Sequence, residues 1–102
     1  MNNVTIMGQL IGSPEIIYEN DKNENKKLYK LILKVQRPFK SKNGSYESDY
    51  INVKAWSNTL GYVDDYYEDS LVSIEGRLIS FASQDKTKYL NEVFANKVVN
   101  YN

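Results

Sequence analysis

In two stretches of this chain, lysines or aromatic residues recur at even intervals. Lys30 and Lys34 lie four residues apart in the first, and even intervals separate Tyr50, Lys54 and Trp56 in the second. Because strand side chains point alternately to two faces, each set lies on one face if the stretches are strands. Single-stranded nucleic acid needs both residue types, since cations follow the phosphates and flat rings stack on the bases. The pattern indicates a surface for such a ligand.

The segment between these stretches extends the pattern. Phe39 follows Pro38 in a polar loop, and Lys40 and Lys42 come soon after it. Packing partners are scarce in such a loop, which favours a ligand contact for the ring. Structural interpretations stay open: Trp56 could plug the end of a barrel, and strand tyrosines and lysines also suit a pleated, solvated surface.

The 102 residues include no cysteine and no histidine. Disulfides, thiolate zinc sites and cysteine nucleophiles are therefore excluded, and the commonest general base is missing. We expect no catalysis, no metal and no cofactor. We also expect neither a signal peptide nor a membrane span, since no apolar run approaches the roughly 18 residues that a span needs, so the cytoplasm is the default location.

The charge is balanced overall but not along the chain. Thirteen basic and thirteen acidic residues give a net charge of zero. Between Lys22 and Lys54, nine basic residues stand against three acids, a net of +6, whereas Gly61 to Glu75 holds five acids and no cation. This separation would steer an anion to one side of the molecule.

Period-two alternation predicts mostly strands, with one helix. The helix begins at Ser57 or Asn58 and carries Leu60, Val63 and Tyr67 at helical spacing. Strands are expected at residues 4–10, 28–36 (ended by Pro38), 47–56, 71–81 and 89–99, and an extended run is expected at residues 15–18.

Turn residues separate these strands. A polar cluster at residues 20–25 predicts a hairpin, and residues 40–45 predict a second turn with Asn43-Gly44 near its tip. Gly76 predicts a bend or bulge. We expect packing roles for Tyr18, Tyr66 and Tyr67, and residues 11–17 could serve a subunit contact.

The order of elements is that of an all-β, five-stranded Greek-key barrel, the OB-fold, with one short helix between its third and fourth strands. We expect a single domain over residues 1–102. OB-folds often bind oligonucleotides on the face of strands two and three. That face carries the rings and lysines described above.

Several motifs, in order and at fitting intervals, resemble the bacterial single-stranded DNA-binding protein family. They are Gly12-Ser13-Pro14-Glu15-Ile16-Ile17-Tyr18, Gln36-Arg37-Pro38-Phe39, Asp49-Tyr50-Ile51-Asn52-Val53-Lys54-Ala55-Trp56, Gly76-Arg77-Leu78 and Tyr89-Leu90-Asn91-Glu92-Val93. The resemblance covers nearly the whole chain. It implies an OB-fold, a homo-oligomer (a tetramer rather than a dimer), and single-stranded DNA binding in replication, recombination and repair.

The resemblance also places the stacking rings of the family at Phe39, Tyr50 and Trp56. The fourth ring of the family would fall on Ser83, so Phe81, two residues earlier on the same face, is the expected substitute. The stacking set is thus Phe39, Tyr50, Trp56 and Phe81, and the expected phosphate ligands are Lys30, Lys34, Arg37, Lys40, Lys42, Lys54 and Arg77.

Alternatives remain open at this point. Family members typically continue into a flexible linker and an acidic tip that recruits other enzymes, whereas this sequence stops at Asn102. If it is complete, a tail-less primosomal replication accessory protein is the runner-up. An OB-fold protein–protein interaction module is the hypothesis from another class, and RNA is an alternative ligand because stacking does not read the sugar.

Overall fold

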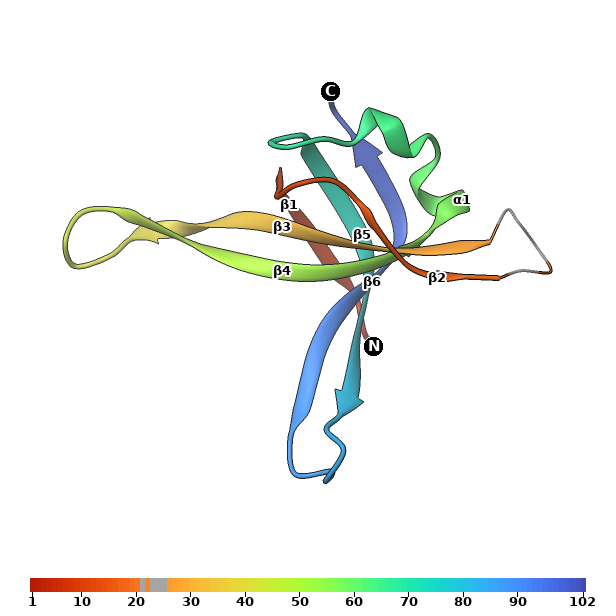
Figure 1. Ribbon diagram of the computed structural model, residues 1–102. Coiled ribbons are helices and arrows are strands. Elements are labelled where there is room, and N and C mark those ends of the chain that lie inside the picture. The colour runs from red at the N-terminus through yellow and green to blue at the C-terminus, as the bar shows by residue number, and fades with distance from the viewer. Residues whose placement is uncertain (21, 23–25) are drawn as a thin grey trace.

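The computed structural model describes residues 1–20, 22 and 26–102, and strands dominate it (Figure 1). Two short helical segments lie between β4 and β5. The elements are β1 (Val4–Leu10), β2 (Glu15–Glu19), β3 (Lys27–Lys40), β4 (Tyr46–Trp56), α1 (Ser57–Leu60), the 3-10 turn η1 (Val63–Asp65), β5 (Leu71–Ala82) and β6 (Tyr89–Asn100).

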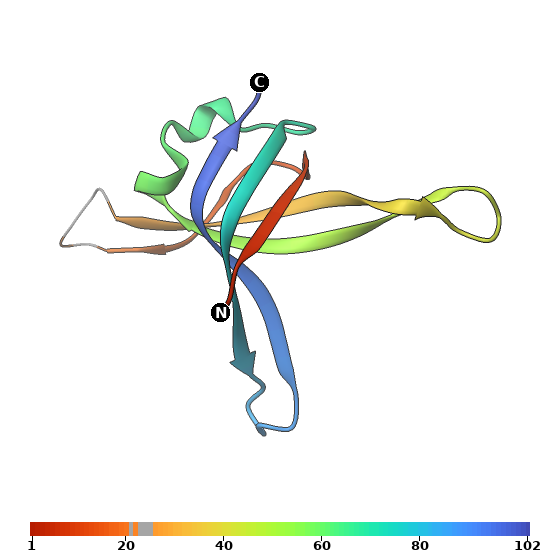
Figure 2. The ribbon, with the colours of Figure 1, turned by 180° about the vertical axis from the view of Figure 1, so that it is seen from behind.

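The strands close into a barrel. They follow the order β1-β5-β6-β4-β3-β2, and an additional pairing of β1 with β3 closes the ring. β4 and β6 pair in parallel at Val53 and Val93, and the other described pairings are antiparallel. From behind, β1, β5 and β6 form one wall (Figure 2). The predicted five-stranded OB barrel is confirmed, and β2 is an extra strand paired outside it on β3.

The inward faces of the strands form the core. Leu31, Leu33 and Val53 are fully buried, as are residues contributed by β1 and β5. Leu60 and Tyr66 are also buried, and the Tyr66 hydroxyl donates a 2.7 Å hydrogen bond to the carbonyl of Leu60. The packing role predicted for Tyr66 is confirmed.

The predicted short helix between the third and fourth barrel strands is confirmed, but it does not extend over Val63 and Tyr67. α1 ends after one turn at Gly61, whose φ of 77° turns the chain away from helical geometry. The chain then re-enters as η1, so Val63 and Tyr67 do not share a helical face with Leu60. Tyr67 is 56% exposed, which also contradicts its predicted packing role. No helix in the described ranges has the length and apolar character to cross a membrane.

The predicted end of a strand at Pro38 is also wrong, because β3 continues to Lys40. The register between β3 and β4 shifts between Gln36 and Lys40, so Pro38 lies where the regular ladder is interrupted. A residue without an N–H donor is tolerated at such an irregularity.

The other predicted turn features can be compared one by one. The register shifts at Gly76, where a Cβ atom would lie 2.1 Å from the carbonyl oxygen of Phe94, so the predicted bulge is confirmed. The turn at residues 41–45 is confirmed, with Gly44 at φ 84°. β2 and β3 pair as predicted for a hairpin, but residues 21 and 23–25 of its turn lie outside the described residues.

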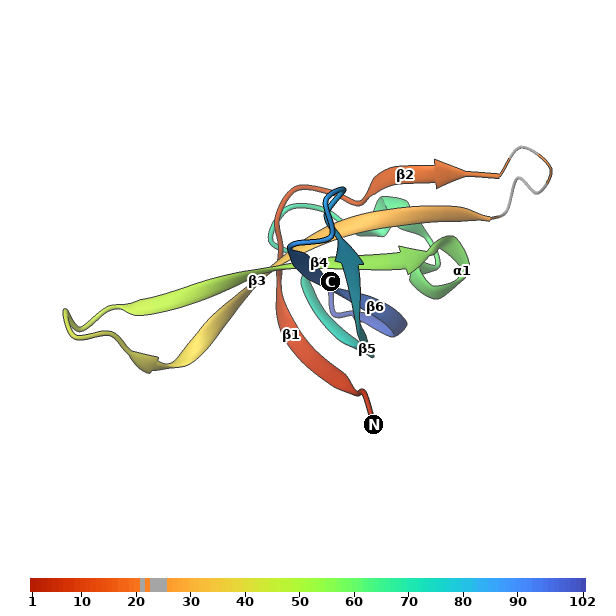
Figure 3. The ribbon, with the colours of Figure 1, turned by 90° about the horizontal axis from the view of Figure 1, so that it is seen from below.

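Two hairpins leave the barrel in different directions (Figures 1 and 3). We call residues 35–49 the β3–β4 arm and residues 79–92 the β5–β6 arm. The first runs to the left in Figure 1 and the second runs downward. The surface between them is therefore bounded by both arms.

Candidate nucleic-acid interface

The register of β3 and β4 places the predicted ligand-binding residues on one face. Lys30 pairs with Lys54, Lys34 with Tyr50, and Leu28 with Trp56. The pairs of the opposite parity, Tyr29–Ala55, Leu31–Val53 and Leu33–Ile51, point into the barrel, where their side chains are buried or half-buried. Core burial therefore fixes the outward orientation of the rings and lysines, because a shift of one residue would exchange the two faces.

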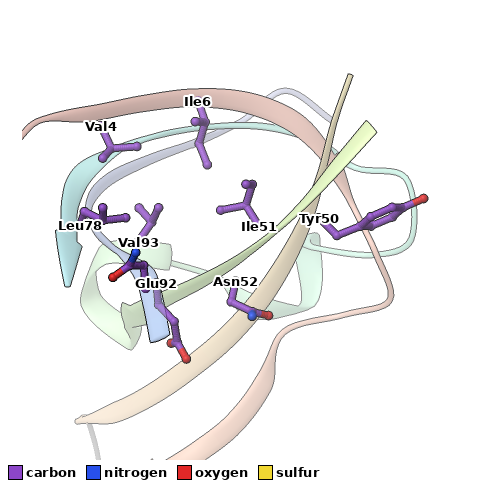
Figure 4. A pocket seen from close by; sticks show the side chains of 9 residues that line it. Val4, Ile6, Tyr50, Ile51, Asn52, Leu78, Glu92 and Val93 are labelled. Carbon is purple, nitrogen blue, oxygen red and sulfur yellow. The ribbon is translucent and has the colours of Figure 1, made fainter. Parts of the chain in front are cut away.

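Tyr50 is the most accessible ring on the barrel part of this face, at 62% exposed. Lys34, its cross-strand partner, is exposed as well. Tyr50 also borders a cavity of about 330 Å³ with a largely apolar wall. In Figure 4 its ring points away from the apolar side chains. The cavity is lined by Val4, Ile6, Tyr50, Ile51, Asn52, Leu78, Asn91, Glu92 and Val93.

Trp56 is half-buried in a small cluster that the sequence analysis did not identify. The edge of the Tyr18 ring meets it at 6.4 Å between centroids and 82° between planes, and the Lys26 ammonium lies 5.5 Å from its centroid. Tyr18 and Trp56 both pair with Leu28, from opposite sides of β3. Tyr18 therefore contacts Trp56 with its ring edge, but it is 51% exposed, so the structure does not place it in the core.

The β3–β4 arm carries further rings and cations beyond the barrel. Phe39 is 63% exposed, and Lys42 lies exposed in the turn. The Lys40 ammonium lies 5.7 Å from the centroid of Tyr46, a half-exposed ring that the sequence analysis missed. Tyr46 and Tyr50 are separated by an even interval on β4, and that was the available signal.

Arg37 is held by carboxylates on the neighbouring strand. Its Nη2 lies 2.8 Å from Asp49 Oδ1 and its Nη1 lies 3.0 Å from Glu47 Oε2. The hydrogen bond from Arg37 lowers the pKa of Asp49, and the same bond raises the pKa of Arg37. A predicted phosphate ligand thus already has two anionic partners.

Lys54 is also paired, at the junction with the β5–β6 arm. Its ammonium lies 3.3 Å from Glu92 Oε2 and 3.9 Å from the centroid of the Phe81 ring. Because Lys54 is on β4, this contact places Phe81, the substitute ring predicted from the sequence, next to the β3–β4 face. Phe81 remains 40% exposed there. Glu92 was not predicted, because nothing in its local sequence indicates its partner.

Arg77 lies on the same side of the sheet as Lys54. Phe94 pairs with Lys54 on one side and with Arg77 on the other, and the Arg77 guanidinium lies 5.4 Å from the Phe94 ring centroid. The structure thus gathers predicted residues from β3, β4 and β5 near the barrel, while Phe39, Lys40 and Lys42 lie farther out on the β3–β4 arm. Within the described ranges, no group of three acidic side chains could hold a metal ion.

Comparison with known proteins gives consistent relatives. A family model described as "Single-strand binding protein family" matches residues 1–101. Single-stranded DNA-binding protein 2 of Streptococcus agalactiae is 32% identical over 98 residues, which cover 93% of this chain and 72% of the relative. The single-stranded DNA-binding protein of Oceanobacillus iheyensis is 30% identical over 102 residues, which cover 96% of this chain and 62% of the relative.

Solved structures agree with the fold. The dimeric N-terminal domain of the PriB protein from Thermoanaerobacter tencongensis superposes with a TM-score of 0.70 at 22% identity, covering 99% of this chain and 97% of that one. A deletion mutant of the single-stranded DNA binding protein from Thermus aquaticus gives 0.76 at 20% identity, covering 100% of this chain and 51% of that one. The motifs, the barrel and the match over residues 1–101 lead to one conclusion: the chain belongs to the single-strand binding protein family.

Proposed function

We propose that this protein binds single-stranded DNA without sequence preference and catalyses no reaction. The observation that carries the proposal is the register of β3 and β4, which sets Tyr50 and Trp56 on one outward face with Lys30 and Lys34. Rings on such a face can stack any base, because every base has a π-face. Lysines beside the rings can follow the phosphates, and the relatives named for this activity support the same reading.

The proposed roles follow the environment of each side chain. Phe39, Tyr50, Trp56 and Phe81 stack bases. Lys30, Lys34, Lys40, Lys42 and Arg77 neutralise phosphates. Arg37 and Lys54 were predicted to do the same, but their carboxylate partners set them apart from the other cations.

The test is a titration of Trp56 fluorescence with oligo(dT) at several salt concentrations. Trp56 is the only tryptophan of the chain, so quenching reports directly on this face. We expect quenching and a log–log salt dependence of roughly −0.7 per phosphate neutralised. A matched duplex is the control and should bind more weakly. Failure to bind oligo(dT) at low salt would reject the function in favour of a protein-interaction module, and preference for oligo(U) would assign RNA.

We further propose that the protein acts as a homo-oligomer, a tetramer rather than a dimer. Ile16 and Ile17 on β2 remain exposed, within the segment expected to contact another subunit. The PriB neighbour, which is described as dimeric, supports self-association. Light scattering should give four copies. Two copies would reject the tetramer but keep the oligomer, and a monomer would reject both.

A further inference from the structure

The cluster of Lys54, Glu92 and Phe81 has a property that the proposed binding role of Lys54 does not account for. The Lys54 and Glu92 side chains are only 19% and 18% exposed, whereas Lys34 on the same face is exposed. The ammonium lies against the Phe81 ring at 3.9 Å from its centroid. Lys54 is thus enclosed by an anion and a ring.

The sheet topology explains why these side chains meet. Lys54 pairs with Phe94 across β4 and β6, and Phe94 pairs with Arg77 across β6 and β5. Glu92 lies two residues from Phe94 along β6, so its side chain points to the same outward face as Lys54. Phe81 lies four residues after Arg77 on β5, so its side chain points to the same face from the β5–β6 arm. The cluster joins the barrel to the base of the β5–β6 arm.

Moving this ammonium to a phosphate would be unfavourable. Glu92 Oε2 is inaccessible to solvent and accepts no hydrogen bond from the described residues, so the Lys54 charge is what compensates it. Withdrawing the ammonium would leave a largely buried carboxylate unpaired, which costs more than the pair itself contributes. A cation over a ring also restrains that ring, through its attraction to the negative ring face.

We propose that Lys54 is a positioning residue: with Glu92 it covers one face of Phe81 and holds the ring so that its other face meets a base. The inference rests on the proposed function and refines it, since it removes Lys54 from the phosphate ligands. Phe81 keeps 40% of its surface exposed, which leaves room for a base on its free side.

The test uses a variant that removes both charges without changing the net charge, Lys54→Met/Glu92→Gln. Binding of labelled oligo(dT) is measured by anisotropy across a salt series for wild type, this variant, Phe81→Ala and the triple variant. We expect Phe81→Ala to weaken binding about 5- to 150-fold, the loss of one stacked base. The charge-neutral variant should bind several-fold more weakly than wild type, at most as weakly as Phe81→Ala, and its salt slope should be unchanged. The triple variant should bind with the affinity of Phe81→Ala.

Three results would overturn the proposal. A slope shallower by roughly 0.7 would make Lys54 a phosphate ligand. Losses that multiply in the triple variant would show that Lys54 acts independently of Phe81, and undiminished binding would show that it has no role. If wild type binds no DNA, the inference falls together with the proposed function, whereas any of the three other results leaves that function intact.

A measurement on the wild type covers the case in which the variant does not fold, which circular dichroism would reveal. NMR of the Lys54 ammonium group should show it unperturbed when oligo(dT) binds. Coupling between that nitrogen and a phosphorus atom would instead assign it to the DNA backbone and overturn the proposal.

Discussion

The two arms carry similar residue types in different environments. Each has an exposed phenylalanine and an ion pair near its base. In the β3–β4 arm, Arg37 and its carboxylate partners have side chains at least 41% exposed. At the base of the β5–β6 arm, the side chains of Glu92 and of its partner Lys54, on β4, are both less than 20% exposed. Composition is therefore a poor guide to what a cation does at each place.

Burial changes the role of a charge in these two places. Water and salt screen the exposed pair, so it contributes little to stability. The enclosed pair is expensive to break and so fixes local geometry. We expect the β3–β4 arm to supply adaptable contacts and the base of the β5–β6 arm to supply a fixed one.

Removing a ring should give the largest effect on DNA binding. Only the ring of the β5–β6 arm should also contribute to the free energy of unfolding. Phe39→Ala and Phe81→Ala should each weaken oligo(dT) binding by roughly 1–3 kcal/mol. Phe39→Ala should leave the free energy of unfolding unchanged, because its ring is 63% exposed, whereas Phe81→Ala also removes a contact of Lys54. Anisotropy and urea denaturation measure the two quantities. Equal stability of both variants would contradict the distinction.

Removal of a carboxylate should destabilise the enclosed ion pair more than the exposed one. Glu92→Ala should lower the free energy of unfolding by about 1–3 kcal/mol, because it leaves an enclosed ammonium unpaired. Glu47→Ala should have a much smaller effect, since Arg37 keeps Asp49 and the pair is exposed. Adding Lys54→Met to Glu92→Ala should restore part of the loss. Equal effects of Glu92→Ala and Glu47→Ala in urea denaturation would show that burial does not distinguish the pairs.

Cation removal on the β3–β4 arm should change the salt dependence of binding. Lys42→Gln should make the log–log slope shallower by roughly 0.7, because an exposed lysine would be free to meet a phosphate. The charge-neutral variant Arg37→Gln/Asp49→Asn is the matched control and should leave the slope unchanged. A shallower slope in the control would add Arg37 to the phosphate ligands.

We expect the smallest effect from acid. Lowering the pH should weaken the turn that contains Asp85 and leave the turn that contains Asn43 unchanged. Asp85 Oδ1 accepts hydrogen bonds from the hydroxyls of Ser83 and Thr87 and from the Thr87 amide, which lower its pKa from 3.8 to about 2. Because the folded pKa is depressed, this stabilisation is present above about pH 3.8 and is lost as the pH falls through about 2. In the other turn, neutral Asn43 accepts from Ser45 and does not titrate.

NMR of the Thr87 and Ser45 amides during acidification measures this difference. The Thr87 signal should shift as Asp85 protonates while the Ser45 signal stays constant. Asp85→Asn should abolish the shift at Thr87. A shift that persists in this variant would place its origin elsewhere.

Strand patterns were the most predictable part of the fold, because burial repeats every second residue and leaves a local signature. Tyr50, Trp56, Lys30 and Lys34 could be placed on one face for the same reason. The place of the short helix could be predicted but its end could not: residues 60, 63 and 67 have helical spacing, but Gly61 turns the chain between them. Pro38 predicted the end of a strand, but β3 continues to Lys40 because a register shift accommodates the proline.

The sequence alone was enough for the order of strands and helix along the chain, the outward set of rings and lysines, and the absence of histidine and cysteine, since each is a property of local spacing or composition. Only the tertiary structure decided which cations are free. Lys54 meets Glu92 and Phe81, and Trp56 meets Tyr18, through pairings between segments far apart in the chain. The availability of a charge depends on its neighbours in space and on its access to water, and neither has a local signature in the chain.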